Sequence, residues 1–173
     1  MLRSNHYDVA FEAWLREQRL PYVAVDERRR ALLVQQSLKS PDFLVHSPVC
    51  GPVVLDVKGR KQLSGAQQRR WENWATHDDL ASLDAWEKIF GGGFKSLLVF
   101  AYELADPDAL SPQPTMLRFH DRRYSFYGVW ASDYRQAMRD RSSRWETVWV
   151  PSARYRALRF PLDRLIRSEA QAV

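Results

Sequence analysis

Cysteine is almost absent from this sequence of 173 residues: only Cys50 is present. A single cysteine excludes an internal disulfide and gives no cysteine-based metal site, since each needs a second thiol. Long apolar runs are also missing, because none approaches the roughly 18 residues needed to cross a bilayer. The N-terminal residues are polar and amphipathic and lack the apolar core of a secretory signal. We therefore expect a soluble, cytoplasmic protein that does not contact a membrane.

Positive charge and aromatic side chains are, by contrast, abundant. The chain has 26 Lys and Arg against 21 Asp and Glu, a formal net charge of +5, and 13% aromatic residues. Excess positive charge favours a polyanionic partner or an anionic membrane surface, although a merely basic soluble protein has the same composition. Aromatic rings can stack on nucleic-acid bases, but in a small domain most of them fill the core. The length fits one globular domain.

Hydrophobic periodicity predicts alternating helices and strands. Apolar residues recur at helical spacing between His6 and Arg19, and Pro21 ends this helix. Residues 42–46 and 53–58 are two β-rich runs separated by a turn that contains Pro and Gly, which predicts an antiparallel hairpin. Residues 31–38 are ambiguous between strand and loop. The other predicted elements here are a strand at 22–25, a basic loop at 59–70, a capped helix at 76–90 and a strand at 95–103.

This order of elements predicts an α/β fold with a mixed central β-sheet flanked by helices. We expect a core at residues 1–104, in the order αβββαβ, and a C-terminal α/β extension at residues 105–173 packed on the same domain. A linker rich in Pro and Asp opens the extension. Its predicted elements are a hairpin of 116–119 with 124–130, a helix at 133–138, a strand at 147–150 and one or two short helices within 153–168.

One predicted strand changes from apolar to charged along a single face. Strand side chains alternate, so Val54, Asp56 and Lys58 point to one side of the sheet. A carboxylate on a buried strand is costly unless it is paired or binds a metal, and an Asp56–Lys58 ion pair would satisfy that need. The hairpin also brings Asp42 close to Asp56, and two neighbouring carboxylates repel unless a cation separates them. An all-oxygen site of this kind prefers Mg²⁺ or Mn²⁺.

These residues carry a resemblance to a known family. The pair Pro41-Asp42, the tripeptide Asp56-Val57-Lys58 after a short hairpin, and Glu12 on the preceding helix resemble the PD-(D/E)xK, restriction-endonuclease-like nuclease superfamily. The spacing is most similar to the Holliday junction resolvase branch. The resemblance covers residues 5–103, has Asp where Glu is frequent in the tripeptide, and finds no counterpart for the residues that follow.

The resemblance implies a role for each matched residue. Asp42, Asp56 and the Val57 carbonyl would bind Mg²⁺ or Mn²⁺, Lys58 would act on the attacking water, and Glu12 would be an accessory acid near the metal. The implied activity is metal-dependent endonucleolytic hydrolysis of phosphodiester bonds in DNA, with branched or damaged DNA as candidate structure-specific substrates. A homodimer is expected, because one site cuts one strand.

Basic and aromatic residues after the catalytic strand are candidates for nucleic-acid contacts. Cations there would bind phosphates and make affinity depend on salt, although a solvated loop would look the same. Two tryptophans three residues apart could stack on unpaired bases, although such a pair is more often part of the core. The candidates are Arg60, Lys61, Arg69, Arg70, Trp71 and Trp74.

Two other classes of function fit the same residues. A nucleic-acid-binding module could keep this fold without hydrolysis. Such a module would usually have lost Asp42, Asp56 or Lys58, whereas all three are present here. A protein-interaction domain could use the charged strand end only as an ion-pair cluster, and it would gain no stability from divalent cations. RNA stays an alternative to DNA.

Overall fold

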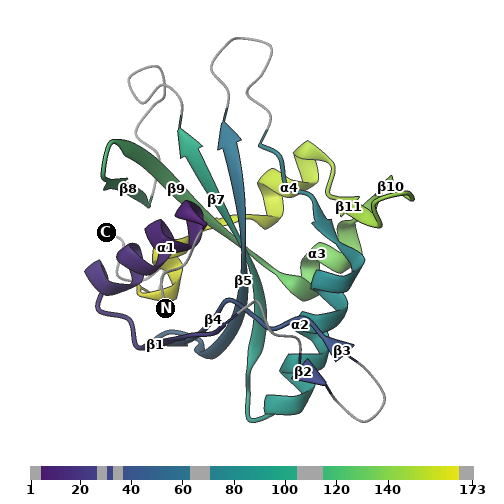
Figure 1. The fold of residues 1–173 in the computed structure, drawn as a ribbon, viewed down its shortest axis with the longest axis horizontal. Coiled ribbons are helices and arrows are strands. Elements are labelled where there is room, and N and C mark those ends of the chain that lie inside the picture. Colours follow the sequence, from purple (N-terminus) through teal and green to yellow (C-terminus); the bar gives the residue numbers. More distant parts are fainter. Residues whose placement is uncertain (1–4, 27–30, 33–36, 63–70, 105–114, 168–173) are drawn as a thin grey trace.

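The computed structural model describes residues 5–26, 31–32, 37–62, 71–104 and 115–167, with backbone alone for 31–32 (Figure 1). A seven-stranded mixed sheet forms its centre, in the order β1-β4-β5-β7-β9-β12, with β8 also paired to β9. Within this sheet β5 and β7 pair parallel, and the other pairs are antiparallel. The strands are β1 (Tyr22–Ala24), β4 (Phe43–Ser47), β5 (Gly51–Gln62), β7 (Lys95–Leu104), β8 (Met116–Phe119), β9 (Arg122–Trp130) and β12 (Phe160–Pro161).

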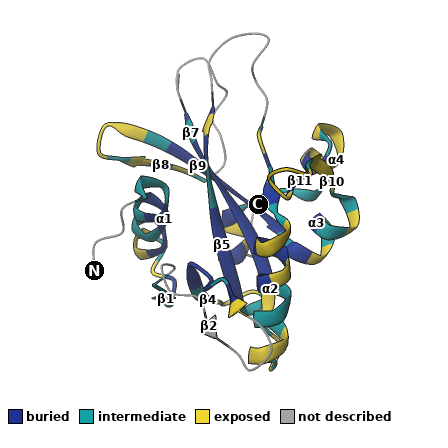
Figure 2. Ribbon diagram, turned by 45° about the vertical axis from the view of Figure 1, so that its right-hand side comes forward, coloured by how far each residue is buried: buried dark blue, intermediate teal, exposed yellow. Residues whose placement is uncertain are grey.

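Helices cover both faces of this sheet, which confirms the predicted α/β class. Helix α1 (His6–Glu17) packs on one face, together with the short 3₁₀ helix η1 (Leu162–Leu165). Figure 1 shows α2 on the side of the sheet away from α1, and Figure 2 shows that β5, β7 and β9 are buried along most of their length. No helix of the described residues is long and apolar enough to cross a membrane. The second face carries α2 (His77–Phe90), α3 (Ala131–Ala137) and α4 (Ser152–Leu158).

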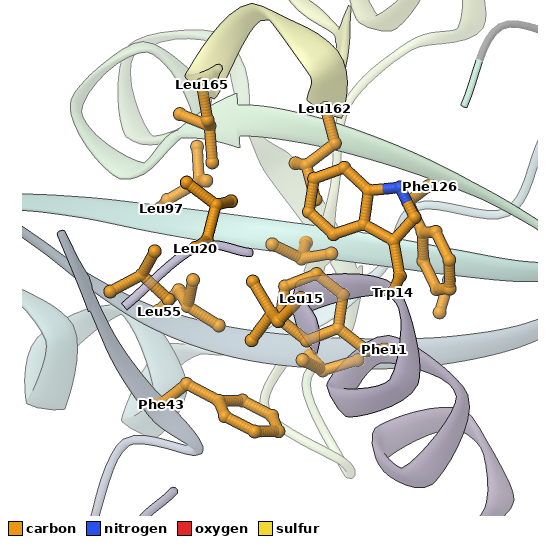
Figure 3. Packing of buried hydrophobic residues seen from close by; sticks show 14 of the residues in the cluster. Phe11, Trp14, Leu15, Leu20, Phe43, Leu55, Leu97, Phe126, Leu162 and Leu165 are labelled. Atoms are coloured by element: carbon orange, nitrogen blue, oxygen red, sulfur yellow. The ribbon is translucent and has the colours of Figure 1, made fainter. Parts of the chain in front are cut away.

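The α1 face is an apolar core. The Asn5 side chain caps α1 by accepting a hydrogen bond from Tyr7 N, as expected for a helix N-cap. Figure 3 shows Phe11, Trp14 and Leu15 gathered against side chains of the sheet and of η1. The Phe11 ring lies 5.2 Å from that of Phe43, in an edge-to-face arrangement typical of aromatic pairs.

Strand β5 is longer than predicted, and the expectation of a loop from residue 59 is wrong for residues 59–62. The strand runs to Gln62 and stays in parallel register with β7, from Val53 opposite Lys95 to Gln62 opposite Leu104. A Cβ atom on Gly59 would lie 2.1 Å from the Tyr7 ring, so this glycine permits close packing of α1 rather than marking a turn. Residues 63–70 lie outside the described part of the chain.

Strands from beyond residue 104 belong to the same sheet as the earlier ones. The predicted hairpin after residue 115 is confirmed as β8 and β9, and β9 pairs with β7. A small second sheet joins β6 (Ala75–Thr76) to β11 (Thr147–Trp149) and β10 (Arg139–Ser142). The ambiguous segment at 31–38 contains a two-stranded pair, β2 (Ala31–Leu32) and β3 (Ser37–Leu38).

Candidate active site

Asp42 and Asp56 lie next to each other across the β4–β5 hairpin. Phe43 is opposite Leu55, and Asp42 immediately precedes β4. The Asp42 backbone N–H donates to the Leu55 carbonyl at 3.0 Å, and its Oδ2 accepts the Val57 N–H at 2.6 Å. Asp42 and Asp56 are each only 2% exposed. The Asp42 side chain is therefore fixed against β5 at the level of Asp56, as the sequence predicted.

Asp56 and Lys58 form a ring of alternating charges with two residues that the sequence analysis did not single out, Lys39 and Asp79. Lys58 Nζ lies 2.5 Å from Asp56 Oδ2 and 2.8 Å from Asp79 Oδ2. Lys39 Nζ lies 3.2 Å from Asp56 Oδ1 and 2.7 Å from Asp79 Oδ1. Each ammonium group therefore bridges the same two carboxylates.

The charges in this ring stabilise one another despite burial. Burial by itself would raise the pKa of Asp79, but Lys58 and Lys39 together lower it well below its ordinary range. Burial likewise works against the charge of Lys39, but Asp56 and Asp79 raise the pKa of this lysine above its ordinary value. The charge of Asp42 acts on Lys39 in the same direction. Two carboxylates thus contact both ammonium groups, and the charge of a third, Asp42, favours the charged form of Lys39.

Asp79 reaches the ring because it opens helix α2. Thr76 Oγ1 accepts the Asp79 N–H at 3.1 Å, and Asp79 Oδ2 accepts the Thr76 N–H at 2.9 Å. These two hydrogen bonds form a capping box, which agrees with the capped helix that the sequence predicted. Because capping alone accounts for an Asp at this position, nothing in the sequence indicated that Asp79 also belongs to the ring. The same Asp79 Oδ2 atom also contacts Lys58 Nζ, so an ion pair links the N-terminus of α2 to β5.

Lys39 reaches the ring from a segment that the sequence left ambiguous. Its backbone N–H donates to Ser82 Oγ at 3.0 Å, and its carbonyl accepts the Trp86 indole N–H at 2.8 Å. Both partners lie on α2, so this helix positions Lys39 as well as Asp79. The available sequence signal was a lysine three residues before Asp42, which is too common to be diagnostic.

Glu12 and Asp8 are two acids of α1 with different environments. Glu12 Oε1 accepts from Arg16 Nη2 and from the Tyr22 hydroxyl, both at 2.8 Å, and the described contacts of Glu12 include none to Asp42 or Asp56. Asp8 is buried, on the side of the helix that also buries Phe11. The sequence analysis did not single out Asp8. Its spacing of three residues from Phe11 was the signal for burial.

Arg60 is turned toward the protein itself. It is buried, and its guanidinium donates to the carbonyl oxygens of Gly59 and Trp74. It also lies 3.8 Å from the centre of the Trp74 ring, and Arg141 lies 5.3 Å from the same ring. Burial lowers the pKa of Arg60. These contacts give Arg60 a structural role, and Trp74 is already flanked by cations of the protein.

The remaining candidates for nucleic-acid contacts are placed in different surroundings. Trp71 packs edge-to-face on Tyr102 at 4.6 Å and lies under the Arg159 guanidinium at 4.2 Å, so it is largely a packing residue. Lys61 is exposed and lines a surface pocket with Arg118, Arg122 and Arg123. Arg69 and Arg70 lie outside the described residues.

The donor set fits a hard divalent cation in part. Mg²⁺ usually binds one or two protein carboxylates and keeps several waters, and Asp42 and Asp56 supply two carboxylates on adjacent strands. Among the residues that the structure describes, no group of three or more His, Cys, Asp or Glu side chains could hold a metal. The nearest partners of Asp56 are two ammonium groups.

Comparison with known proteins identifies the fold. No protein-family model matches the chain, and no curated protein matches it by sequence. Among solved structures it is similar to Hjc, a Holliday junction resolvase from the archaeal hyperthermophile Archaeoglobus fulgidus, with a TM-score of 0.53 and 12% sequence identity. The match covers 92% of this chain and 92% of that chain. The chain therefore has the mixed α/β fold of this resolvase, which confirms the restriction-endonuclease-like architecture predicted from the sequence.

Proposed function

We propose that the protein is a Mg²⁺- or Mn²⁺-dependent endonuclease that hydrolyses phosphodiester bonds in DNA. The observation that carries this proposal is the fixed position of Asp42 beside Asp56, with Lys58 two residues further along β5 on the same face as Asp56. The fold supports this proposal, because the resolvase Hjc shares the architecture over 92% of the Hjc chain. Fold alone does not imply function, so the argument rests on these side chains.

Each residue of the cluster has a role in this proposal. Asp42, Asp56 and the Val57 carbonyl would hold the divalent ion, which would neutralise charge on the phosphoryl oxygens and make a bound water more acidic. Lys58 would donate a hydrogen bond to the attacking water or to a phosphate oxygen. Asp79, which touches Lys58 Nζ, is then a positioning residue for that ammonium group.

An accessory acid from α1 would complete the site that the family resemblance implies. Glu12 was the sequence candidate, but its carboxylate bonds Arg16 and Tyr22. Asp8 is buried beside Tyr7, which packs on Gly59, and α1 thus covers the face of β5 opposite Asp56 and Lys58. Exchange of Glu12 for glutamine tests whether it contributes to cleavage.

The proposed substrate is DNA, with branched structures as the first to test. Lys61, Arg118, Arg122 and Arg123 line one pocket together with the acids Glu103 and Asp121, and the cations that exceed these acids would contact phosphates, which makes binding depend on salt. We propose a cytoplasmic homodimer, since two sites are needed to cut both strands of a symmetric substrate.

A second candidate function is a nucleic-acid-binding module that keeps the fold without hydrolysis. One observation favours it: Lys39 and Lys58 already neutralise Asp56 and Asp79 by direct contact. In that case the ring is a structural cluster, and divalent ions would neither bind nor stabilise the protein.

A cleavage panel separates the two candidates. Labelled linear duplex, single strand, flap, four-way junction and RNA are incubated with Mg²⁺, Mn²⁺ or EDTA, using wild type and Asp56→Asn in parallel. Metal-dependent cutting that disappears in the variant is the expected result. Binding without cutting by wild type, together with no shift in melting temperature on adding Mn²⁺, would replace the nuclease by the binding module.

A further inference from the structure

Lys39 is the member of the charged ring that lies toward solvent. The side chains of Asp56, Asp79 and Lys58 are 3%, 6% and 11% exposed, whereas that of Lys39 is 29% exposed. A divalent ion that approaches Asp56 from solvent therefore meets the Lys39 ammonium group first. Two carboxylates at this distance from one ammonium group form the environment that a metal cation would also prefer.

The Lys39 backbone is held to α2, so only the Lys39 side chain would have to move for its ammonium group to leave the ring. Both backbone hydrogen bonds of Lys39 go to α2, through Ser82 and Trp86. The four-carbon stem of lysine can move the ammonium group by several ångströms without moving these anchors. Lys58 lies within the central sheet and is more enclosed, so it is less suited to leave.

We propose that Lys39 is a built-in counter-ion that occupies the cation position beside Asp56 and must be displaced for a divalent ion to bind. Once displaced, the anchored side chain remains at the site and contacts a phosphate of the substrate. This proposal rests on the proposed function for its phosphate step. Its metal-binding step stands separately and can be measured without DNA.

The test is the affinity for Mn²⁺ of the full chain without DNA, measured by electron paramagnetic resonance of free Mn²⁺. Lys39→Met should bind Mn²⁺ at least about ten-fold more tightly than wild type, because a competing cation and its repulsion are both removed. Lys88→Met is the matched control, since Lys88 is an exposed lysine of α2 that pairs with Asp84 and lies outside the ring. It should bind as wild type does. Equal or weaker Mn²⁺ binding by folded Lys39→Met overturns the proposal.

A double variant separates displacement from simple charge. Lys39→Met with Asp79→Asn removes one cation and one anion, so the charge of the ring is unchanged and the risk of unfolding falls. If Lys39 competes for the position, the double variant, whose ring has the same charge as wild type, also binds Mn²⁺ more tightly than wild type. Tightening in the single variant only would show that charge, not occupancy, is responsible, and would overturn the proposal.

Failure of this proposal and failure of the nuclease assignment give different results. If wild type cleaves DNA but neither Lys39 variant binds Mn²⁺ more tightly, only the proposed role of Lys39 is wrong. If both variants bind Mn²⁺ more tightly but no protein cleaves DNA, the nuclease assignment is wrong and the counter-ion proposal stands. If neither wild type nor any variant binds Mn²⁺, both proposals are wrong.

A separate observation concerns the hairpin of β10 and β11, which exposes tryptophan among arginines. Trp145, in the turn, is 68% exposed, and Trp149 on β11 is 37% exposed. The Arg144 guanidinium lies 5.3 Å from the Trp145 ring, and Arg139 and Arg141 on β10 are also exposed. Large exposed aromatic side chains beside cations fit bases together with phosphates.

This hairpin is connected to the charged ring through hydrogen-bonded backbone. Thr147 on β11 pairs with Thr76 on β6, and the Thr76 N–H donates to Asp79 Oδ2. Figure 1 shows β11 beside the chain that leads into α2. The exposed tryptophans are therefore held in a fixed relation to the proposed active site.

We infer that the β10–β11 hairpin binds unpaired nucleotides of a DNA substrate, by stacking on Trp145 and Trp149 and by arginine contacts to phosphates. The test is fluorescence anisotropy in EDTA with a single strand and a fully paired duplex. Trp145→Ala should weaken binding of the single strand by about ten-fold and leave the duplex unchanged. Ile89→Ala, which removes an exposed apolar side chain of α2, is the control and should change neither. Unchanged single-strand binding, or equal losses on both DNAs, overturns the inference.

Discussion

The two faces of strand β5 have different chemistry. Val53, Leu55 and Val57 enter an apolar core with α1, where packing and burial supply stability. On the other face, Asp56 and Lys58 lie in a ring of ion pairs beneath α2. Buried ion pairs contribute little net stability compared with apolar packing, because desolvation opposes their attraction. Both faces of the sheet carry apolar cores, but on β5 the α2 face adds to Val54 a charged geometry that stability alone does not require.

The largest expected effect is on the charged face. Asp56→Asn removes a proposed metal ligand, so metal-dependent cleavage should fall by at least about 1000-fold. DNA binding in EDTA should be retained or become tighter, since a negative charge near the phosphate is lost. Cleavage assays and anisotropy measure the two effects, and Asp42→Asn should behave in the same way. Joint loss of DNA affinity and of fold in both variants would contradict the assignment.

The apolar face should respond in stability and not in metal binding. Phe11→Ala opens a cavity between α1 and the sheet and should lower the free energy of unfolding by about 3–5 kcal/mol. Urea denaturation measures this change, and Val23→Ala, at an exposed position of β1, should stay within about 0.5 kcal/mol of wild type. If folded Phe11→Ala also binds Mn²⁺ more weakly, the two faces are coupled and the comparison above is too simple.

Lys58→Ala should separate turnover from metal binding. The variant should cleave about 100-fold more slowly, because the group that acts on the water or the phosphate is lost. Its affinity for Mn²⁺ should be at least that of wild type, since Asp42 and Asp56 remain. Single-turnover cleavage and Mn²⁺ titration test the two parts, and a loss of Mn²⁺ affinity would argue against the assigned roles.

The charged face should also make stability depend on pH. Because Lys58 and Lys39 lower the pKa of Asp79 in the folded state, ionised Asp79 stabilises the fold fully above its unfolded pKa of about 3.9. This stability is lost as pH falls below that value toward the folded pKa. The difference in free energy of unfolding between wild type and Asp79→Asn should therefore narrow on acidification. A difference that is constant from pH 6 to pH 3, or that grows, would contradict the ion pairing.

The smallest effect is expected at Glu12. Glu12→Gln weakens a surface contact with Arg16, so cleavage should change by less than about two-fold. Rates measured at saturating Mg²⁺ test this expectation. A loss of about ten-fold or more in folded Glu12→Gln would restore Glu12 as the accessory acid.

The hairpin and its charged end could be predicted because local rules govern them. Strand periodicity placed Asp56 and Lys58 on one face, and a short hairpin brought Asp42 beside them. The capping box at Thr76 and the α1 core positions followed from spacing in the same way. The length of β5 could not be predicted, because the backbone partners of residues 59–62 are on β7, about forty residues further along the chain.

The sequence by itself determined that Asp42, Asp56 and Lys58 lie together on a hairpin, the order of most helices and strands, and the α/β class. Only the tertiary structure decided what surrounds those residues. Asp79 and Lys39 join the ring because the parallel pairing of β5 with β7 lays α2 across the charged face of the sheet. Contacts of this kind depend on the packing of a helix against a sheet, and neither periodicity nor spacing encodes which side chains then meet.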